Sequence, residues 1–156
     1  MNSKSEQQGG VAERISFSCS PSINGIPPST MAKTPRGEIA VIRWVSDHFK
    51  DSGFGRQTRC DLVSKNFQKY QDDGTLNYIT TGIMNEQSVV CVSSKAGGYC
   101  TGLLFTLKPD EDASRVIQQL FDISYKAQAP LYESSGSPRI YIDMKKFLAE
   151  APVQNN

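Results

Sequence analysis

The sequence predicts an α+β fold, in which an antiparallel β-sheet carries two main helices packed on one face and two disulfides staple the chain. Three observations support this prediction. Residues 76–108 form three consecutive strand patterns joined by short turns, and strands joined in this way pair antiparallel. One helical pattern precedes this segment and another follows it. The four cysteines are an even number, as a disulfide framework requires.

Length and composition set the limits of the fold. A chain of 156 residues fits one domain that is large enough to bury a core. We expect a flexible N-terminal segment over residues 1–12, a single domain over 13–149 and a flexible tail over 150–156. An apolar content of 38% and a charged content of 21% are typical of globular proteins.

Charge and hydropathy exclude several classes of function. The net charge of +1 gives no overall field for binding nucleic acid. The sequence has no apolar run of about 18 residues, so no transmembrane segment is predicted. The polar N-terminus has no apolar stretch of the kind that signal peptides carry, so we do not expect residues 1–12 to be a signal peptide.

The N-terminal third of the chain is predicted to form β-strands. Residues 15–20 alternate apolar and small polar side chains, which predicts a half-buried strand. A turn rich in proline and glycine follows, and residues 30–34 are a short strand. After a proline-led turn, residues 38–45 form a strand whose two faces are both largely apolar, as in the centre of a sheet.

A first helix is predicted after a loop over residues 46–57. Thr58 is its expected N-cap, with Asp61 three residues later as a variant of the capping box. Gly74 occupies the C-terminal glycine position. The apolar stripe of this helix consists of Cys60, Val63, Phe67 and Tyr70.

The second half continues with a meander and a second helix. Strands are predicted over residues 77–84, 87–92 and 101–107, the first two joined by a two-residue turn. Asp110 or Asp112 then caps a helix that extends to about residue 125. We expect its apolar face to be Val116, Ile117, Leu120 and Phe121. The remaining predicted elements are an irregular loop over 127–138, a strand over 139–143 and a helical turn over 144–148.

The cysteines indicate an oxidising compartment. None of the four forms a CxxC pair, which argues against a zinc site, and we predict neither a metal nor any other cofactor. Of the three possible connectivities, we favour Cys91–Cys100, which closes a hairpin-like loop, together with Cys19–Cys60, which ties a strand to a helix. The alternative is four buried free thiols in a cytosolic protein.

One segment has the composition of an anion site. Glycines, arginines and backbone amides that precede a helix can hold a phosphate or a carboxylate. The candidate residues are Gly53, Gly55, Arg56, Thr58 and Arg59. The alternative is a flexible loop followed by an N-cap. Lys33, Arg36, Arg43, Arg56 and Arg59 form a basic patch if the fold brings them together.

Two aromatic residues are candidate interface anchors, because each lies in a glycine-containing loop: Phe54 between two glycines, and Tyr99 after Gly97-Gly98. The alternative is that both are loop residues that pack down onto the protein. No catalytic set is evident. His48 is the single histidine, and its serine and aspartate neighbours are adjacent in sequence rather than contributed by separate elements. We therefore expect that the chain is not an enzyme.

A family resemblance covers residues 15–148. The matching segments are Phe17-Ser18-Cys19, residues 32–37, Ile42-Arg43-Trp44, Arg59-Cys60 with Val63-Ser64 and Phe67, residues 76–82, Val90-Cys91-Val92, residues 100–107 and residues 141–144. In this order they resemble the circadian oscillating protein family of cyanobacteria.

The resemblance implies export, peripheral association with a membrane and rhythmically controlled abundance, and it implies no catalytic residues. We therefore expect a non-enzymatic, extracytoplasmic binding module, in the periplasm or thylakoid lumen, that works at a membrane surface through a protein partner. The alternative is a small-anion or small-ligand binder that uses residues 53–59.

Overall fold

The computed structural model describes residues 14–45, 55–121, 132–134 and 137–154. In chain order the elements are β1 (Ser16–Ser20), β2 (Ser29–Thr34), β3 (Gly37–Arg43), α2 (Arg56–Asp73), β4 (Tyr78–Met84), β5 (Gln87–Ser93), β6 (Gly102–Thr106), α3 (Ala113–Phe121), β7 (Tyr132–Ser134), β8 (Ser137–Arg139), β9 (Ile142–Asp143) and α4 (Met144–Glu150). Antiparallel sheets, helices and two disulfides confirm the predicted α+β class.

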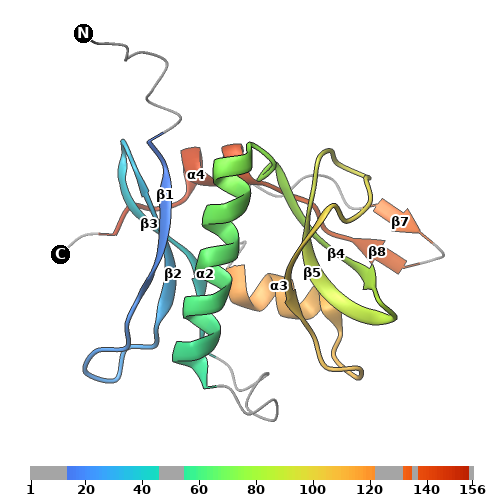
Figure 1. The fold of residues 1–156 in the computed structure, drawn as a ribbon, viewed down its shortest axis with the longest axis horizontal. Coiled ribbons are helices and arrows are strands. Elements are labelled where there is room, and N and C mark those ends of the chain that lie inside the picture. The colour runs from blue at the N-terminus through green and yellow to red at the C-terminus, as the bar shows by residue number, and fades with distance from the viewer. Residues whose placement is uncertain (1–13, 46–54, 122–131, 135–136, 155–156) are drawn as a thin grey trace, which may run out of the picture.

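The strands are divided between sheets, where we had expected one. The first sheet has the order β1-β2-β3, the second has the order β6-β5-β4-β9, and β7 pairs with β8. Every pairing is antiparallel. Figure 1 shows α2 standing between the first and second sheets.

Side chains of α2 explain why the two sheets stay separate. On the open edge of β1, the backbone N–H of Phe17 donates to Gln68 Oε1 over 2.7 Å. On the open edge of β6, Asn66 Nδ2 donates to the carbonyl of Leu104 over 3.0 Å. The Tyr70 hydroxyl donates to the carbonyl of Leu103, also on β6, over 2.9 Å. The helix therefore satisfies edge groups that a further strand would otherwise pair with.

The close approach of Tyr70 to β6 depends on a glycine. A Cβ at Gly102 would lie 2.6 Å from the Tyr70 ring, so a larger residue there would displace the ring. Desolvation raises the pKa of the Tyr70 hydroxyl, and the carboxylate of Asp73 adds to this, while the bond to β6 opposes it.

One aromatic core joins the two sheets. Phe67 of α2 stacks on Phe17 of β1 at a centroid distance of 5.3 Å and lies 6.4 Å from Phe121 of α3. Trp44 packs edge-on against Phe105 of β6 at 5.5 Å. The predicted apolar face of α3 is buried as expected, at Val116, Ile117, Leu120 and Phe121.

Buried hydroxyl groups in this core are paired. Thr30 Oγ1 accepts a hydrogen bond from Trp44 Nε1 over 3.1 Å and another from Ser64 Oγ over 2.9 Å. Thr30 and Ser64 are both buried. The network fixes the indole of Trp44 between β2 and α2, because burying these polar groups without partners would be costly.

The chain after α4 packs on the first sheet, although the sequence had suggested a flexible tail from residue 150. Ala151 is buried, and the backbone N–H of Gln154 donates to the carbonyl of Glu38 over 2.7 Å. A Cβ at Gly37 would lie 2.6 Å from Val153, so the tail sits tightly against the β2–β3 turn. The predicted segment 1–12 lies outside the described residues.

Two other predictions need correction or refinement. Residues 127–138 were expected to be an irregular loop, but β7 and β8 form an antiparallel pair within and beside that range. Between the two candidate caps of α3, Asp112 is the one observed, since its Oδ1 accepts from the N–H of Arg115 over 3.4 Å. The structure gives α3 as far as Phe121.

The backbone of the β4–β5 turn is strained at two residues that are not glycine. Asn85 and Glu86 both have positive φ, 52° and 64°, as a tight hairpin turn requires. Glycine adopts a positive φ with less steric cost than other residues, because it has no Cβ. We therefore expect Glu86→Gly, at the second position of the turn, to raise the free energy of unfolding by about 1 kcal/mol. Urea denaturation measures the change. Glu86→Ala keeps the strain and serves as the control; an equal gain in that variant would refute the explanation.

Candidate functional site

The predicted anion site lies at the start of α2. Gly55 is the N-cap, in an extended conformation with φ −77° and ψ 175°, and no described side chain caps the helix. Our prediction that Thr58 is the N-cap is therefore wrong. The carbonyl of Gly55 already accepts the N–H of Arg59 over 3.1 Å, which places Thr58 inside the first turn.

The two arginines of this site differ in exposure. Arg56 and Thr58 are exposed. Arg59 is half-buried, and desolvation lowers the pKa of its guanidinium. Gly53 and Phe54 lie outside the described residues, so only part of the predicted site can be placed.

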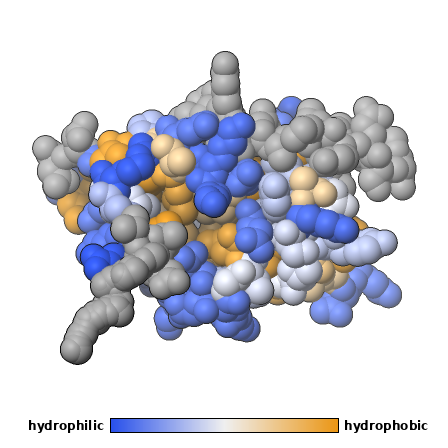
Figure 2. All heavy atoms as spheres, turned by 90° about the horizontal axis from the view of Figure 1, so that it is seen from above, coloured by the Kyte–Doolittle hydropathy of each residue, from blue (hydrophilic) through white to orange (hydrophobic). Residues whose placement is uncertain are grey.

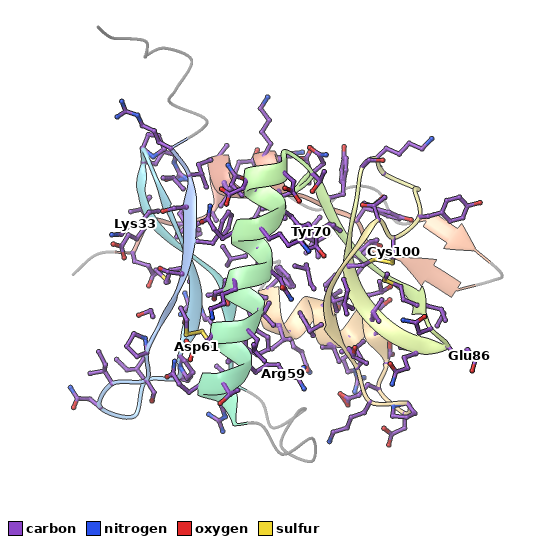
Figure 3. The ribbon with its side chains drawn as sticks, viewed as in Figure 1. Lys33, Arg59, Asp61, Tyr70, Glu86 and Cys100 are labelled. Carbon is purple, nitrogen blue, oxygen red and sulfur yellow. A yellow bond between two sulfur atoms is a disulfide. The ribbon has the colours of Figure 1, made fainter. Side chains whose placement is uncertain are left out.

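The five basic residues do not form one patch. Figure 3 shows Lys33 on the first sheet, well separated from Arg59 at the lower end of α2. Arg36 is used structurally, since its guanidinium donates to the carbonyls of Leu148 and Ala151 at the end of α4. The basic patch is therefore divided over different parts of the surface.

Both predicted disulfides are present. Cys19–Cys60 joins β1 to α2 with a Cα–Cα distance of 5.6 Å, and Cys91–Cys100 joins β5 to the segment before β6 with 5.5 Å. None of the four cysteines is free. The prediction that Cys60 lies on the apolar stripe of α2 is confirmed, since its side chain is fully buried.

The loop between β5 and β6 presents Tyr99 to solvent. Its side chain is 90% exposed, the largest exposed fraction among the large hydrophobic side chains that the structure describes. The loop beneath it is fixed, because the Cys91–Cys100 bond closes its base (Cys100 is labelled in Figure 3). The buried Tyr141 donates its hydroxyl hydrogen to the carbonyl of Gly98 over 2.9 Å.

Further bonds hold the same loop. The backbone N–H of Gly98 and Ser93 Oγ both donate to the carbonyl of Lys95, over 3.0 Å and 2.9 Å. A Cβ at Gly98 would lie 2.7 Å from Ser93 Oγ, so the backbone here is closely packed. Tyr99 is thus an exposed aromatic on a loop fixed at several points, and its role as an interface anchor stays a prediction.

A second exposed apolar feature was missed in the sequence. The turn between β1 and β2 is a tight hairpin at Asn24-Gly25, whose residues have φ of 51° and 81°. It presents Ile23 and Ile26, which are 55% and 64% exposed. The N–H of Ser22 donates to Gln57 Oε1 over 3.2 Å, which places this tip beside the start of α2. Two isoleucines that flank an Asn-Gly turn are the signal that identifies it.

The described ranges lack two kinds of feature. Among those residues, no three metal-ligating side chains come together. No helix found there is long and apolar enough to cross a bilayer. His48 lies outside the described residues.

Comparison with known proteins gives one match. The chain matches no curated protein and no solved structure at a significant level. The family model described as Circadian oscillating protein COP23 matches residues 16–149, which span every strand and helix described here apart from the last residue of α4. The chain therefore belongs to the circadian oscillating protein COP23 family.

Proposed function

We propose that the chain is a non-enzymatic, exported interaction module that binds a protein partner at a cyanobacterial membrane surface, with rhythmically controlled abundance as the family resemblance implies. Two disulfides support an extracytoplasmic location, because disulfides persist in oxidising compartments. Protein isolated from its source with four free thiols would contradict the export part of this proposal.

The fixed loop with Tyr99 is the observation that carries the proposal. Tyrosine supplies a large contact area at low conformational cost, since only two side-chain torsions must be ordered. A loop that is already rigid loses little further entropy on binding. The closed loop and its 90% exposed tyrosine therefore have the properties of an interface anchor.

The isoleucine hairpin supports the membrane-surface part. Ile23 and Ile26 project from a tight turn, and the exposed Arg56 begins the neighbouring helix. An apolar tip beside a cation suits the boundary between headgroups and acyl chains, where apolar side chains bury and cations meet anionic lipid.

Tyr99→Ser is expected to weaken partner binding about 30-fold, the loss of about 2 kcal/mol that defines a hot spot. The partner is first captured by cross-linked pull-down from cyanobacterial membrane extract with the oxidised protein. Its affinity for the wild type and the variant is then measured by surface plasmon resonance.

Ile83→Ser is the matched control, because Ile83 is 68% exposed and lies on β4 rather than on the closed loop. We expect this control to bind as tightly as the wild type. Equal weakening by both substitutions, or none by Tyr99→Ser, would show that the loop is not the binding surface.

The start of α2 supports a second candidate function, binding of a small anion. Its first turn has no side-chain cap among the described residues, and Arg56 and Thr58 are exposed there. Millimolar phosphate is then expected to raise the melting temperature of the wild type by a few degrees, and that of Arg56→Ala by much less. Equal shifts in both proteins, or none in either, would remove this candidate.

A further inference from the structure

A small apolar groove lies between the first sheet and α4, away from the Tyr99 loop. Its volume is about 240 Å³. Ile15 just before β1, Pro35 in the β2–β3 turn, and Leu148 and Ala149 on α4 line it. The surface inside is almost entirely apolar. Figure 2 looks onto this end of the molecule and shows hydrophobic residues in orange among hydrophilic ones in blue.

Two cationic residues also line the groove, Arg36 and Lys145. Because little polar surface faces the interior, their aliphatic stems form part of the apolar wall and their charged ends lie beyond it. No carboxylate belongs to the lining. The groove therefore combines an apolar interior with positive charge, and this combination complements a ligand that has an alkyl chain and an anionic head.

Arg36 is held in place before any ligand arrives. Its Nη1 donates to the carbonyls of Leu148 and Ala151 over 2.8 Å and 3.1 Å, and its Nη2 donates to Ala151 over 2.8 Å. These bonds use three of the five N–H donors of a guanidinium. The turn is also fixed, because the N–H of Arg36 donates to Thr34 Oγ1 over 3.1 Å. A cation ordered in this way costs less entropy to engage than a mobile one.

We propose that this groove binds a free, single-chain alkyl carboxylate, with the chain over Ile15, Pro35 and Leu148 and the carboxylate beside Arg36 and Lys145. The volume is below the ~300–1,000 Å³ of sites for drug-sized ligands, which limits the occupant to one chain of moderate length. This inference is independent of the proposed partner-binding function, since none of the lining residues lies in the Tyr99 loop.

The test is a titration of the full chain with hexanoate, octanoate and decanoate below their micelle concentrations, followed by ¹H–¹⁵N NMR. We expect shifts at Ile15, Leu148 and Ala149, and about 3- to 4-fold tighter binding per added methylene until the groove is filled. Octanol and octylamine should bind about 2- to 5-fold more weakly than octanoate, because they lack the charge that pairs with the exposed cations.

Variants locate the site. Ala149 is exposed on α4, so Ala149→Phe can fill the groove without disturbing the core and should weaken decanoate binding at least about 10-fold. Lys145→Glu should weaken it at least about 5-fold. Lys146→Glu makes the same charge change at an exposed neighbour outside the lining and should leave affinity unchanged.

Three results would overturn the proposal. The first is equal affinity for octanoate and octylamine. The second is decanoate binding that Ala149→Phe leaves intact. The third is binding to vesicles of anionic lipid with none to free decanoate, which would make this end of the molecule a bilayer contact instead.

Discussion

A variant carrying Cys19→Ala and Cys60→Ala is expected to lose about 4 kcal/mol of unfolding free energy relative to the wild type. The two cysteines are 41 residues apart in sequence, and closing so long a loop removes much entropy from the unfolded chain. The bond also fastens β1 to α2, the helix on which both sheets depend. A domain is typically stable by only about 5–15 kcal/mol, so this loss is a large share.

The second disulfide provides the comparison for this experiment. Cys91 and Cys100 are 9 residues apart, so replacing both with alanine is expected to cost about 3 kcal/mol, less than the first pair. Cys60 and Cys91 are both fully buried, so each double variant also leaves a cavity of the same kind. Urea denaturation of each double variant measures the two losses. The reverse order would mean that native-state packing outweighs chain entropy at these positions.

Local elements were predictable because their signals are local. The helical stripe containing Cys60 and Phe67, the turn at residues 85–86 and the Cys91–Cys100 bond each follow from short-range spacing in the sequence. Bounds shifted by a few residues, as at Thr58, because Gly55 and the helix-forming Arg56 and Gln57 allow α2 to start earlier.

The division into two sheets was not predictable in this way. Asn66 and Gln68 lie on α2, where polar residues in a helix indicate a solvent-exposed face. In the structure Asn66 and Gln68 form hydrogen bonds with strand edges that are distant in sequence. Tyr70, from the predicted apolar stripe, does so through its hydroxyl. Nothing in the spacing of residues within one helix specifies which strand edge a side chain will meet.

The candidate sites show the same contrast. Tyr99 was identified because it directly follows two glycines in sequence, which indicates a loop. The groove of Ile15, Pro35 and Leu148 was not, because its walls come from β1, a turn and α4, which are brought together only by the fold. Arg36 looked like surface charge, and its bonds to α4 depend on that long-range contact.

Phe67→Ala is expected to cost about 3–5 kcal/mol, because the removed ring is fully buried between the first sheet and α3. Phe67 stacks on Phe17 from the first sheet at 5.3 Å and approaches Phe121 of α3 at 6.4 Å. Its loss therefore removes apolar burial and leaves a cavity between the first sheet, α2 and α3. Urea denaturation with an unchanged slope measures the effect.

Two substitutions separate this cause from a general weakening of α2. Leu62→Ala changes the same helix at a side chain that is 47% exposed, and should cost less than about 1 kcal/mol. Phe67→Leu keeps most of the volume and should cost about 1–2 kcal/mol. If Phe67→Ala cost no more than Leu62→Ala, the aromatic contacts of Phe67 would not be what stabilises the packing of α2 in the core. The edge bonds from Asn66 and Gln68 would then have to supply that stability, and Asn66→Ala would become the more damaging change.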